Sequence, residues 1–291
     1  SSEDVLSRWQ NTVSGIRDAY LDDTQIYPWV IGFSGGKDST VVAQGIFEAL
    51  LTIPPSKRTR AVHIVSNDTM VESPLVIAHL DEVTKHINQA AINLDLPVTV
   101  SRTKPKPEET FWVLLIGKGY PSPNMTMRWC TDRLKIQPTS AYIKKYISEY
   151  GGAIVALGVR RDESQHRQRS IDKHRNVRGR NLMPHPVLQG AFVYRPIVDL
   201  TTADVWEILG AFHAPWGGNH NKLFRLYRDA EGGECPVVLS RNEAPGCGTS
   251  NSRFGCWICT VVEKDKSLQG FIDSGKHHYK PLVDFRDWLK E

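Results

Sequence analysis

Hydrophobic residues along the chain follow two alternating patterns, one typical of helices and one typical of buried strands. Apolar residues recur at helical spacing in four segments, residues 3–20, 39–51, 75–93 and 139–150. Short apolar runs that predict strands lie between them, at residues 28–33, 60–68, 96–103 and 152–160. A fifth helical segment, residues 201–212, begins with Thr201 as its capping residue. Because helices separate successive strands, the pattern predicts an α/β fold with a parallel sheet and right-handed crossovers.

The regular pattern fades toward the end of the chain. From about residue 217 the sequence is rich in Gly, Pro and Cys and has little periodicity, until a helical pattern returns in the closing stretch "KPLVDFRDWLKE". We therefore place a boundary between residues 212 and 218. The predicted organisation is an α/β domain over residues 1–214 and a small Cys-rich lobe with a C-terminal helix over residues 215–291.

Composition narrows the class of protein. With 40% hydrophobic and 23% charged residues among 291, the chain is expected to be soluble and globular. It has no apolar run near the roughly 18 residues of a membrane helix and no basic-then-apolar leader, so we expect no membrane partner and a cytoplasmic location. Five cysteines, an odd number, favour thiol or metal chemistry over a disulfide framework.

The stretch "WVIGFSGGKDSTVVAQGIFEAL", residues 29–50, places a glycine-rich turn between a predicted strand and a predicted helix. Glycines there can take positive φ, and backbone N–H groups at the start of a helix attract anions. In a parallel sheet this turn lies at the carboxyl edge, where ligands bind. The spacing does not fit a Walker A loop, and Asp38 occupies the position of its hydroxyl residue. The turn is therefore predicted to be a phosphate-binding loop of another type.

Residues 34–39, Ser-Gly-Gly-Lys-Asp-Ser, resemble the pyrophosphate loop (PP-loop) of the N-type ATP pyrophosphatases at every fixed position. This resemblance implies an adenine-nucleotide α-hydrolase-like fold and cleavage of ATP between its α and β phosphates. Lys37 can neutralise charge on the departing pyrophosphate and Asp38 can bind Mg²⁺, which makes both residues catalytic candidates. The nucleotide-binding candidates in this loop are Ser34, Gly35, Gly36, Lys37, Asp38, Ser39 and Thr40.

Three further segments are similar to the phosphoadenylylsulfate reductase branch of the same superfamily. They are "MRWCTDRLKIQP", "LGVRRDESQHR" and "RPIVDLTTADVWEIL", and with the loop they cover most of residues 29–260 in the family's order. The second segment adds Gly158 and Arg160 to the nucleotide-binding candidates. Asp68, just after the second strand, lies where this family contacts the nucleoside, although an Asx turn or helix cap is an equal alternative for it.

The cysteines carry a separate signal. Cys256 and Cys259 form a C-x₂-C pair, whose spacing suits zinc or an iron–sulfur cluster. Cys130 and Cys235 would complete a set of four ligands, and Cys247 would remain as a reactive sulfur. Structural zinc is the alternative to a cluster.

The stretches "RWCTDRLK", "CPVV" and "CGTSNSRFGCWICTVVEKDKSL" resemble the DNA phosphorothioation sulfurtransferases, the DndC type and its SspD relatives. The resemblance implies a [4Fe-4S] cluster on Cys130, Cys235, Cys256 and Cys259. It also implies that ATP adenylylates a DNA backbone phosphate and that sulfur then displaces AMP. The sulfur would come from a cysteine desulfurase through Cys247 or a cluster-bound sulfide, with other phosphorothioation proteins as partners.

Other functions stay open at this point. Cluster-binding reductases carry paired cysteines where this chain has Trp129 and Cys130, and the late catalytic cysteine of the cluster-free reductases is not found. These departures disfavour reduction of an activated sulfate. The alternatives are a phosphoadenylylsulfate reductase, a tRNA thiolase, and a non-catalytic ATP- and DNA-binding module with a structural metal site.

Basic residues concentrate in residues 160–180, which contain eight Lys or Arg and only three acidic residues. The run follows the fourth strand, so it leaves the sheet at the same edge as the phosphate-binding loop. Arg160 and Arg161 are expected nearer the nucleotide phosphates, and Arg161 also joins the candidates for DNA phosphate contacts. The other DNA candidates are Arg167, Arg169, Lys173, Arg175, Arg178 and Arg180. A solvated surface loop is the alternative.

Overall fold

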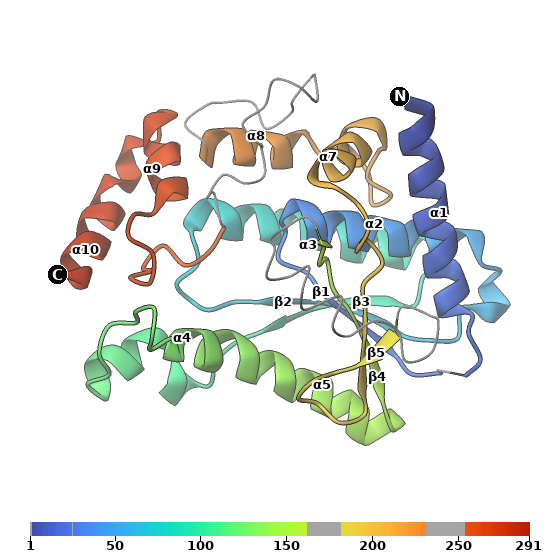
Figure 1. The fold of residues 1–291 in the computed structure, drawn as a ribbon, viewed down its shortest axis with the longest axis horizontal. Helices are drawn as coiled ribbons and strands as arrows, with labels where there is room; N and C mark the ends of the chain where they lie inside the picture. Colours follow the sequence, from blue (N-terminus) through green and yellow to red (C-terminus); the bar gives the residue numbers. More distant parts are fainter. Residues whose placement is uncertain (1, 25, 162–181, 231–253) are drawn as a thin grey trace. The chain divides into compact units, whose positions relative to one another are not determined.

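A computed structural model describes residues 2–24, 26–161, 182–230 and 254–291 of the chain (Figure 1). These residues form two compact units that interleave along the sequence. The first unit contains Ser1–Ser66, Glu82–Ser101 and Tyr142–His220, and the second contains Asn67–Asp81, Arg102–Ala141 and Asn221–Glu291. The second unit therefore combines most of the predicted Cys-rich lobe with two segments drawn from the first 214 residues.

A six-stranded sheet, in the order β3-β2-β1-β4-β6-β5, is the centre of the fold. The strands are β1 (Trp29–Gly32), β2 (Val62–Asn67), β3 (Val98–Thr103), β4 (Ala153–Ala156), β5 (Leu182–Pro184) and β6 (Ala191–Tyr194). Strand β1 pairs in parallel with β2 and β4, and β4 pairs in parallel with β6. The predicted α/β class and the four predicted strands are confirmed. Strands β5 and β6 were not predicted from the sequence. The edge strand β5 is antiparallel to β6, and its three residues are too few to give a periodic signal.

Helices cover both faces of this sheet (Figure 1). The helices of the first unit, or shared with it, are α1 (Ser2–Tyr20), α2 (Lys37–Thr52), α3 (Pro74–Asn93), α5 (Gln137–Tyr150) and α7 (Thr202–Ala211). On one face α2 is almost wholly buried, and Trp9 of α1 donates a hydrogen bond to Glu48 of α2. On the other face Ile143 and Tyr146 of α5 pack against strand residues. Among the described residues, no helix combines the length and apolar character that crossing a bilayer requires.

The second unit is built from short helices around two apolar clusters. Its helices are η2 (Pro107–Glu109), η3 (Val113–Gly117), α4 (Trp129–Thr131), η4 (Asp132–Ile136), α8 (Asn221–Ala230), α9 (Lys266–Asp273), η6 (His277–Tyr279) and α10 (Lys280–Lys290). One cluster contains Phe111, Leu134 and Ile258, and the other contains Leu268 and Phe271. A further short helix, η1 (Pro55–Lys57), precedes β2 in the first unit. Cys130 and Cys256 pack against the first of the two clusters of the second unit.

The predicted start of α7 is confirmed in detail. Thr201 accepts a hydrogen bond from the backbone N–H of Asp204 at 3.1 Å, and the Asp204 carboxylate accepts one from the backbone N–H of Thr201 at 2.8 Å. This reciprocal arrangement is a capping box, which satisfies two backbone donors that the helix itself leaves without partners. Arg8 of α1 also contacts Asp204, at 2.9 Å, so the cap helps to join α7 to α1.

Candidate functional site

The predicted phosphate-binding loop lies where the order of the strands reverses. From β1 the chain proceeds outward to β2 and β3, and then returns to place β4 on the other side of β1. The loop leaves the carboxyl end of β1, and the segment after β4 leaves the sheet beside it. Ligands of open α/β sheets bind at such a switch point, because the two diverging connections leave a crevice there.

The loop itself is closed by its own hydrogen bonds. Gly35 has a φ of +75°, which favours glycine at this position. Ser39 Oγ accepts a hydrogen bond from the backbone N–H of Ser34 at 3.2 Å and donates one to the Gly36 carbonyl at 3.0 Å. Thr40 is buried, and its hydroxyl also donates to Gly36, at 2.8 Å. Gly36 is the N-cap of α2, so the N-terminus of this helix is not capped by a side chain.

Charged side chains meet at the first turn of α2. Lys37 Nζ lies 3.2 Å from Asp38 Oδ2, and Arg160 Nε lies 2.7 Å from Asp38 Oδ1. Arg160 is only 2% exposed and also donates a hydrogen bond to Thr202 Oγ1 at 3.0 Å. The structure therefore brings Arg160 to the loop, where it contacts Asp38 and the start of α7, and its contact with a nucleotide stays a prediction.

Gly158 contacts the same turn through its backbone. A Cβ atom added at Gly158 would lie 2.9 Å from the carbonyl carbon of Asp38 and 3.1 Å from the backbone nitrogen of Ser39. Backbone atoms cannot move aside as the end of a flexible side chain can. The glycine therefore allows the segment after β4 to pack directly on the first turn of α2, which places Arg160 within reach of Asp38.

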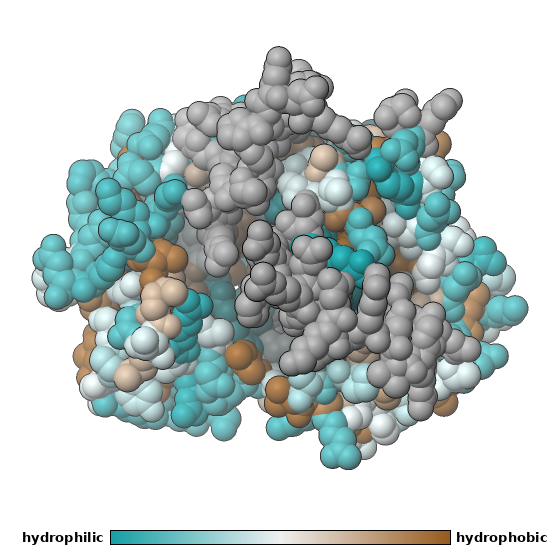
Figure 2. Space-filling model, viewed as in Figure 1, coloured by the Kyte–Doolittle hydropathy of each residue, from teal (hydrophilic) through white to brown (hydrophobic). Residues whose placement is uncertain are grey.

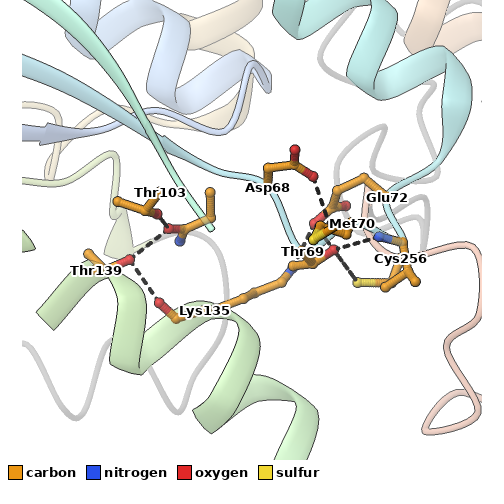
Figure 3. Close-up of polar contacts among 10 residues, drawn as sticks. Asp68, Thr69, Met70, Glu72, Thr103, Lys135, Thr139 and Cys256 are labelled. Carbon is orange, nitrogen blue, oxygen red and sulfur yellow. Dashed lines mark hydrogen bonds and ion pairs between the residues drawn. The ribbon is translucent and has the colours of Figure 1, made fainter. Parts of the chain in front are cut away.

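Asp68 belongs to the second unit and forms an Asx turn. Its Oδ1 accepts a hydrogen bond from the backbone N–H of Met70 at 2.8 Å (Figure 3). Its Oδ2 lies 3.5 Å from Lys104 Nζ. Met70 has a φ of +64°, which the turn helps to support. The alternative of an Asx turn is thus present in the structure, and a nucleoside contact by Asp68 stays a prediction.

Cys256 lies among polar side chains that follow β2 (Figure 3). Its Sγ is 3.3 Å from Thr69 Oγ1 and 3.9 Å from a carboxylate oxygen of Glu72, which itself lies 3.6 Å from Lys135 Nζ. Burial, followed by the Glu72 carboxylate, raises the pKa of the Cys256 thiol to about 12. Burial lowers the pKa of Lys135, but the neighbouring Cys256 and Glu72 more than offset this, so that its pKa is raised.

The cysteines that the structure describes gather in the second unit. Cys130, Cys256 and Cys259 are all free thiols, and the backbone N–H of Cys259 donates to the Cys256 carbonyl at 3.2 Å. Burial raises the pKa of Cys130, and the proximity of Cys259 raises it further. Three soft sulfur donors in one region match the chemistry that zinc or an iron–sulfur cluster requires.

The metal geometry itself is not formed in the described part of the chain. Among residues 2–24, 26–161, 182–230 and 254–291, no group of three or more His, Cys, Asp or Glu side chains is arranged to hold a metal ion. The two other predicted sulfur residues, Cys235 and Cys247, lie outside the described residues. The metal ligand set and the role of Cys247 therefore stay predictions.

The basic run is described only at its start. Arg161 is partly exposed and its guanidinium lies 3.4 Å from the carboxylate of Asp199, whose side chain is 73% exposed. The remaining DNA candidates lie outside the described residues: Arg167, Arg169, Lys173, Arg175, Arg178 and Arg180.

Several site residues have contacts that sequence reasoning missed. Thr202 anchors Arg160, whereas Thr69 and Glu72 contact Cys256. Nothing in the local pattern around Thr69 and Glu72 distinguishes them from ordinary polar residues. Thr202 and Lys135 are different, because they stand in the "RPIVDLTTADVWEIL" and "CTDRLK" segments that carried part of the resemblance, and their positions there were a usable signal.

Comparisons with known proteins agree with the motifs over most of the chain. A family model described as the phosphoadenosine phosphosulfate reductase domain matches residues 28–262. An uncharacterized protein of Methanocaldococcus jannaschii is 25% identical over 266 residues, which cover 90% of this chain and 42% of the relative. A nin region protein of Escherichia phage lambda is 30% identical over 149 residues, covering 46% of this chain and 48% of the relative. The chain spans about half the length of the curated relatives it matches.

Solved structures with a related arrangement of elements are distant in sequence. One is the U34-tRNA thiolase NcsA from Methanococcus maripaludis with its [4Fe-4S] cluster, which is 13% identical, with a TM-score of 0.44 and coverage of 100% of this chain and 80% of that chain.

Proposed function

This chain belongs to the phosphoadenosine phosphosulfate reductase domain family, and from that premise we propose that it is an ATP pyrophosphatase and sulfurtransferase. Its substrate in this proposal is a DNA backbone phosphate, which is converted to a phosphorothioate. One observation carries the proposal. The loop between β1 and α2 lies at the switch point of the sheet, and Lys37 and Arg160 both contact Asp38 at the first turn of α2.

The first step is activation of the acceptor phosphate. A non-bridging oxygen of the DNA phosphodiester attacks the α-phosphorus of ATP, a new P–O bond forms, and the bond from the α-phosphorus to the β-phosphate oxygen breaks. The loop N–H groups and the start of α2 hold the departing pyrophosphate, and Lys37 neutralises its charge. Asp38 is the residue that would hold Mg²⁺, a hard cation that would further neutralise the phosphates. Its two carboxylate oxygens contact Lys37 and Arg160 in the structure, so Mg²⁺ would replace one of these contacts.

The second step is sulfur transfer. A sulfur nucleophile at the oxidation level of hydrosulfide attacks the activated backbone phosphorus, the bond to the AMP oxygen breaks, and AMP leaves. AMP carries the former non-bridging oxygen away with it and is a far better leaving group than an oxide ion, which is why ATP is needed. A [4Fe-4S] cluster on Cys130, Cys235, Cys256 and Cys259 would supply a place to hold sulfide. Sulfur would arrive from a cysteine desulfurase as a persulfide, which a thiol must reduce to release hydrosulfide.

The choice of DNA as acceptor rests on sequence features. The cysteine segments resemble those of the phosphorothioation enzymes, and the run at residues 160–180 carries the positive charge that a polyanion requires. Phosphate contacts do not read sequence, so a defined modification site requires partner proteins of the same system.

The direct test uses ATP labelled at its α-phosphate. The purified chain is incubated anaerobically with labelled ATP, Mg²⁺, duplex DNA and sodium hydrosulfide, and AMP, pyrophosphate and phosphorothioate-linked dinucleotides are measured after nuclease digestion. We expect DNA-dependent release of AMP and pyrophosphate in equal amounts. Two controls should abolish it: the variant Lys37→Met, and an ATP analogue with a methylene group between the α and β phosphates.

The alternatives give different products in parallel reactions. Sulfite release from an activated sulfate with a dithiol donor would identify a reductase, and sulfur bound to a base of tRNA would identify a thiolase. ATP binding without any cleavage, with or without added desulfurase, would identify a non-catalytic binding module. Each of these results contradicts the proposal of DNA phosphorothioation.

A further inference from the structure

Arg286 is a charged residue in the core of the second unit. It lies in α10, whose other charged side chains Lys280, Asp284, Asp287 and Lys290 are exposed or partly exposed, and Figure 2 shows a mostly hydrophilic surface in this region at the left of the view. Arg286 is 0% exposed. Burying a guanidinium costs free energy unless its N–H groups find hydrogen-bond acceptors. The acceptors that Arg286 contacts therefore indicate the role of this residue.

Four hydrogen bonds of Arg286 are defined, and three end on one segment of backbone. Nε donates to the Cys259 carbonyl at 2.8 Å, Nη1 donates to the Glu263 carbonyl at 2.9 Å, and Nη2 donates to the Val262 carbonyl. Nη1 also donates to the carboxylate of Asp287 at 2.5 Å. Lys290, one turn further along α10, donates to the same Glu263 carbonyl at 3.1 Å. The helix therefore holds the chain that runs from Cys259 to Glu263.

The cysteine pair is held on its other side by a different element. Trp257 donates its backbone N–H to the Val71 carbonyl at 3.0 Å, and Ser73 donates to the Gly255 carbonyl at 3.2 Å. Together with the isolated bridge between Glu72 and Cys256, these bonds fix the start of the turn against the segment after β2. The end of the turn, at Cys259, has no such strand bond in the described chain, and its carbonyl is bound by Arg286 instead.

Arginine has the right shape for this task. Its planar guanidinium carries five donors in a rigid fork, so that one side chain can satisfy several carbonyls that point in different directions. Residues 259–263 lie outside helices and strands, so their carbonyls need such partners when they are enclosed. Because a peptide is planar and trans, fixing the Cys259 carbonyl also fixes the plane of the peptide that joins Cys259 to Thr260.

We infer that Arg286 is a positioning residue for the cysteine pair: it holds the backbone from Cys259 to Glu263 so that the Cys259 thiol keeps its place beside Cys256. This inference rests on the proposed function only in taking these thiols as working ligands. The hydrogen bonds themselves do not depend on that function.

Alkylation of the thiols tests the inference without ATP, DNA or metal. The reduced, metal-free full chain is pulsed with iodoacetamide, and the labelling rates of Cys130, Cys256 and Cys259 are measured separately by mass spectrometry. In Arg286→Met we expect Cys259 to react about tenfold faster, because removing hydrogen bonds to a charged group lets the segment open more often. Cys130, on α4, should keep its rate and serves as the internal reference.

Two variants separate positioning from general loss of stability. Arg286→Lys keeps the charge but not the fork, so it should also speed labelling of Cys259, and it replaces Arg286→Met if that chain fails to fold. Leu282→Ala removes packing on the same helix and leaves Arg286 in place. It should lower the melting temperature without any selective change at Cys259.

A second measurement uses Co²⁺ as the probe of the thiolate site. Groups that orient metal ligands typically change metal affinity by about 10- to 100-fold when removed, so Arg286→Lys should bind Co²⁺ at least about tenfold more weakly than Leu282→Ala. Equal acceleration of all three thiols, or unchanged labelling and unchanged Co²⁺ affinity in Arg286→Lys, would overturn the inference. A chain that binds Co²⁺ normally but releases no pyrophosphate would contradict the proposed function alone.

Discussion

Arg160 Nε donates a hydrogen bond to Asp38 Oδ1 at 2.7 Å, although the two residues are 122 positions apart in the sequence. Asp38 belongs to the first turn of α2, and Arg160 follows β4 and is also bound to Thr202 at the start of α7. The Asp38 carboxylate is therefore held in one orientation by a buried partner. Catalytic groups act best when their orientation is fixed in advance. The contact between Arg160 and Asp38 therefore supports the ATP cleavage that we propose at the loop.

Replacing Arg160 with methionine should damage both stability and ATP cleavage. The change leaves Asp38 without its buried partner, which should lower the free energy of unfolding by about 2 kcal/mol. It should also raise the Mg²⁺ concentration needed for half-maximal pyrophosphate release, since Asp38 loses its fixed orientation. For the stability measurement alone the matched control is Arg161→Met, whose partner Asp199 is 73% exposed, so that its removal should lower the free energy of unfolding by less than about 1 kcal/mol. Equal effects of the two substitutions would contradict this prediction.

Replacing Gly158 with alanine should separate the segment after β4 from the loop. The new Cβ would lie 2.9 Å from a backbone atom of Asp38, and relief requires a backbone shift that should cost roughly 1–3 kcal/mol. We expect weaker ATP binding by calorimetry as well as lower stability. Gly15→Ala on α1 is the control, because a Cβ there has no atom within 4 Å and should be neutral or slightly stabilising.

His63 should make the stability of the first unit fall in mild acid. The residue is 9% exposed, its ring stacks on Tyr146 at 4.2 Å, and Nδ1 lies 2.7 Å from Thr99 Oγ1. Burial, and then Lys145, lowers its pKa below the ordinary value of about 6.5, while Glu149 opposes this. The unfolded chain therefore takes up a proton first, and stability present above about pH 6.5 is lost as the pH falls toward the lowered folded pKa.

The measurement for His63 is the urea midpoint at pH 7.5 and pH 5. His63→Phe keeps an aromatic ring but cannot be protonated, so its midpoint should fall less between these pH values than that of the natural chain. His86→Phe, at an exposed position of α3, should leave the pH dependence unchanged. The same fall in the natural chain and in His63→Phe would assign the pH dependence to other groups.

The cysteines should differ in their effect on bound metal. Changing any one of the predicted ligands Cys130, Cys235, Cys256 and Cys259 to serine should remove most iron and sulfide from anaerobically purified protein. Cys247→Ser should keep the metal and lose only sulfur transfer. Iron, zinc and sulfide analysis with an ultraviolet-visible spectrum checks both statements. A colourless natural chain with one bound zinc would favour the structural alternative.

The basic run should control DNA affinity through salt-dependent binding to phosphates. Reversing charge in Arg169→Glu and Arg175→Glu should weaken binding to any duplex sequence and reduce the slope of log affinity against log salt by about 0.9 for each DNA phosphate that the variant no longer neutralises. Lys144→Glu, at an exposed position of α5, makes the same kind of charge reversal elsewhere and is the control. Unchanged affinity and slope in the double variant would remove the run from the DNA site.

The local elements of this protein could be predicted from sequence because each depends on neighbouring residues. Apolar spacing gave α2, α3 and α5 to within a few residues, Thr201 gave the start of α7, and the glycines gave the turn between β1 and α2. The turn at residues 34–39 is a single short segment, so its residue types and their order were enough to predict its place between β1 and α2, and phosphate binding by this turn stays a prediction. Helices α8 and α9 were missed, because the surrounding Gly, Pro and Cys residues obscure their shorter patterns.

What only the tertiary structure decided is which distant side chains meet. Arg160 and Asp38 are 122 residues apart in the sequence, and Glu72 and Cys256 are 184 residues apart. Arg286 lies 23–27 residues from the three carbonyls that it binds. An arginine in an amphipathic helix or a glutamate after a strand looks like an ordinary surface charge in the sequence. Its partner is selected by the packing of the sheet and the cores, where a buried charge must find a hydrogen-bonding group, and no local pattern records that choice.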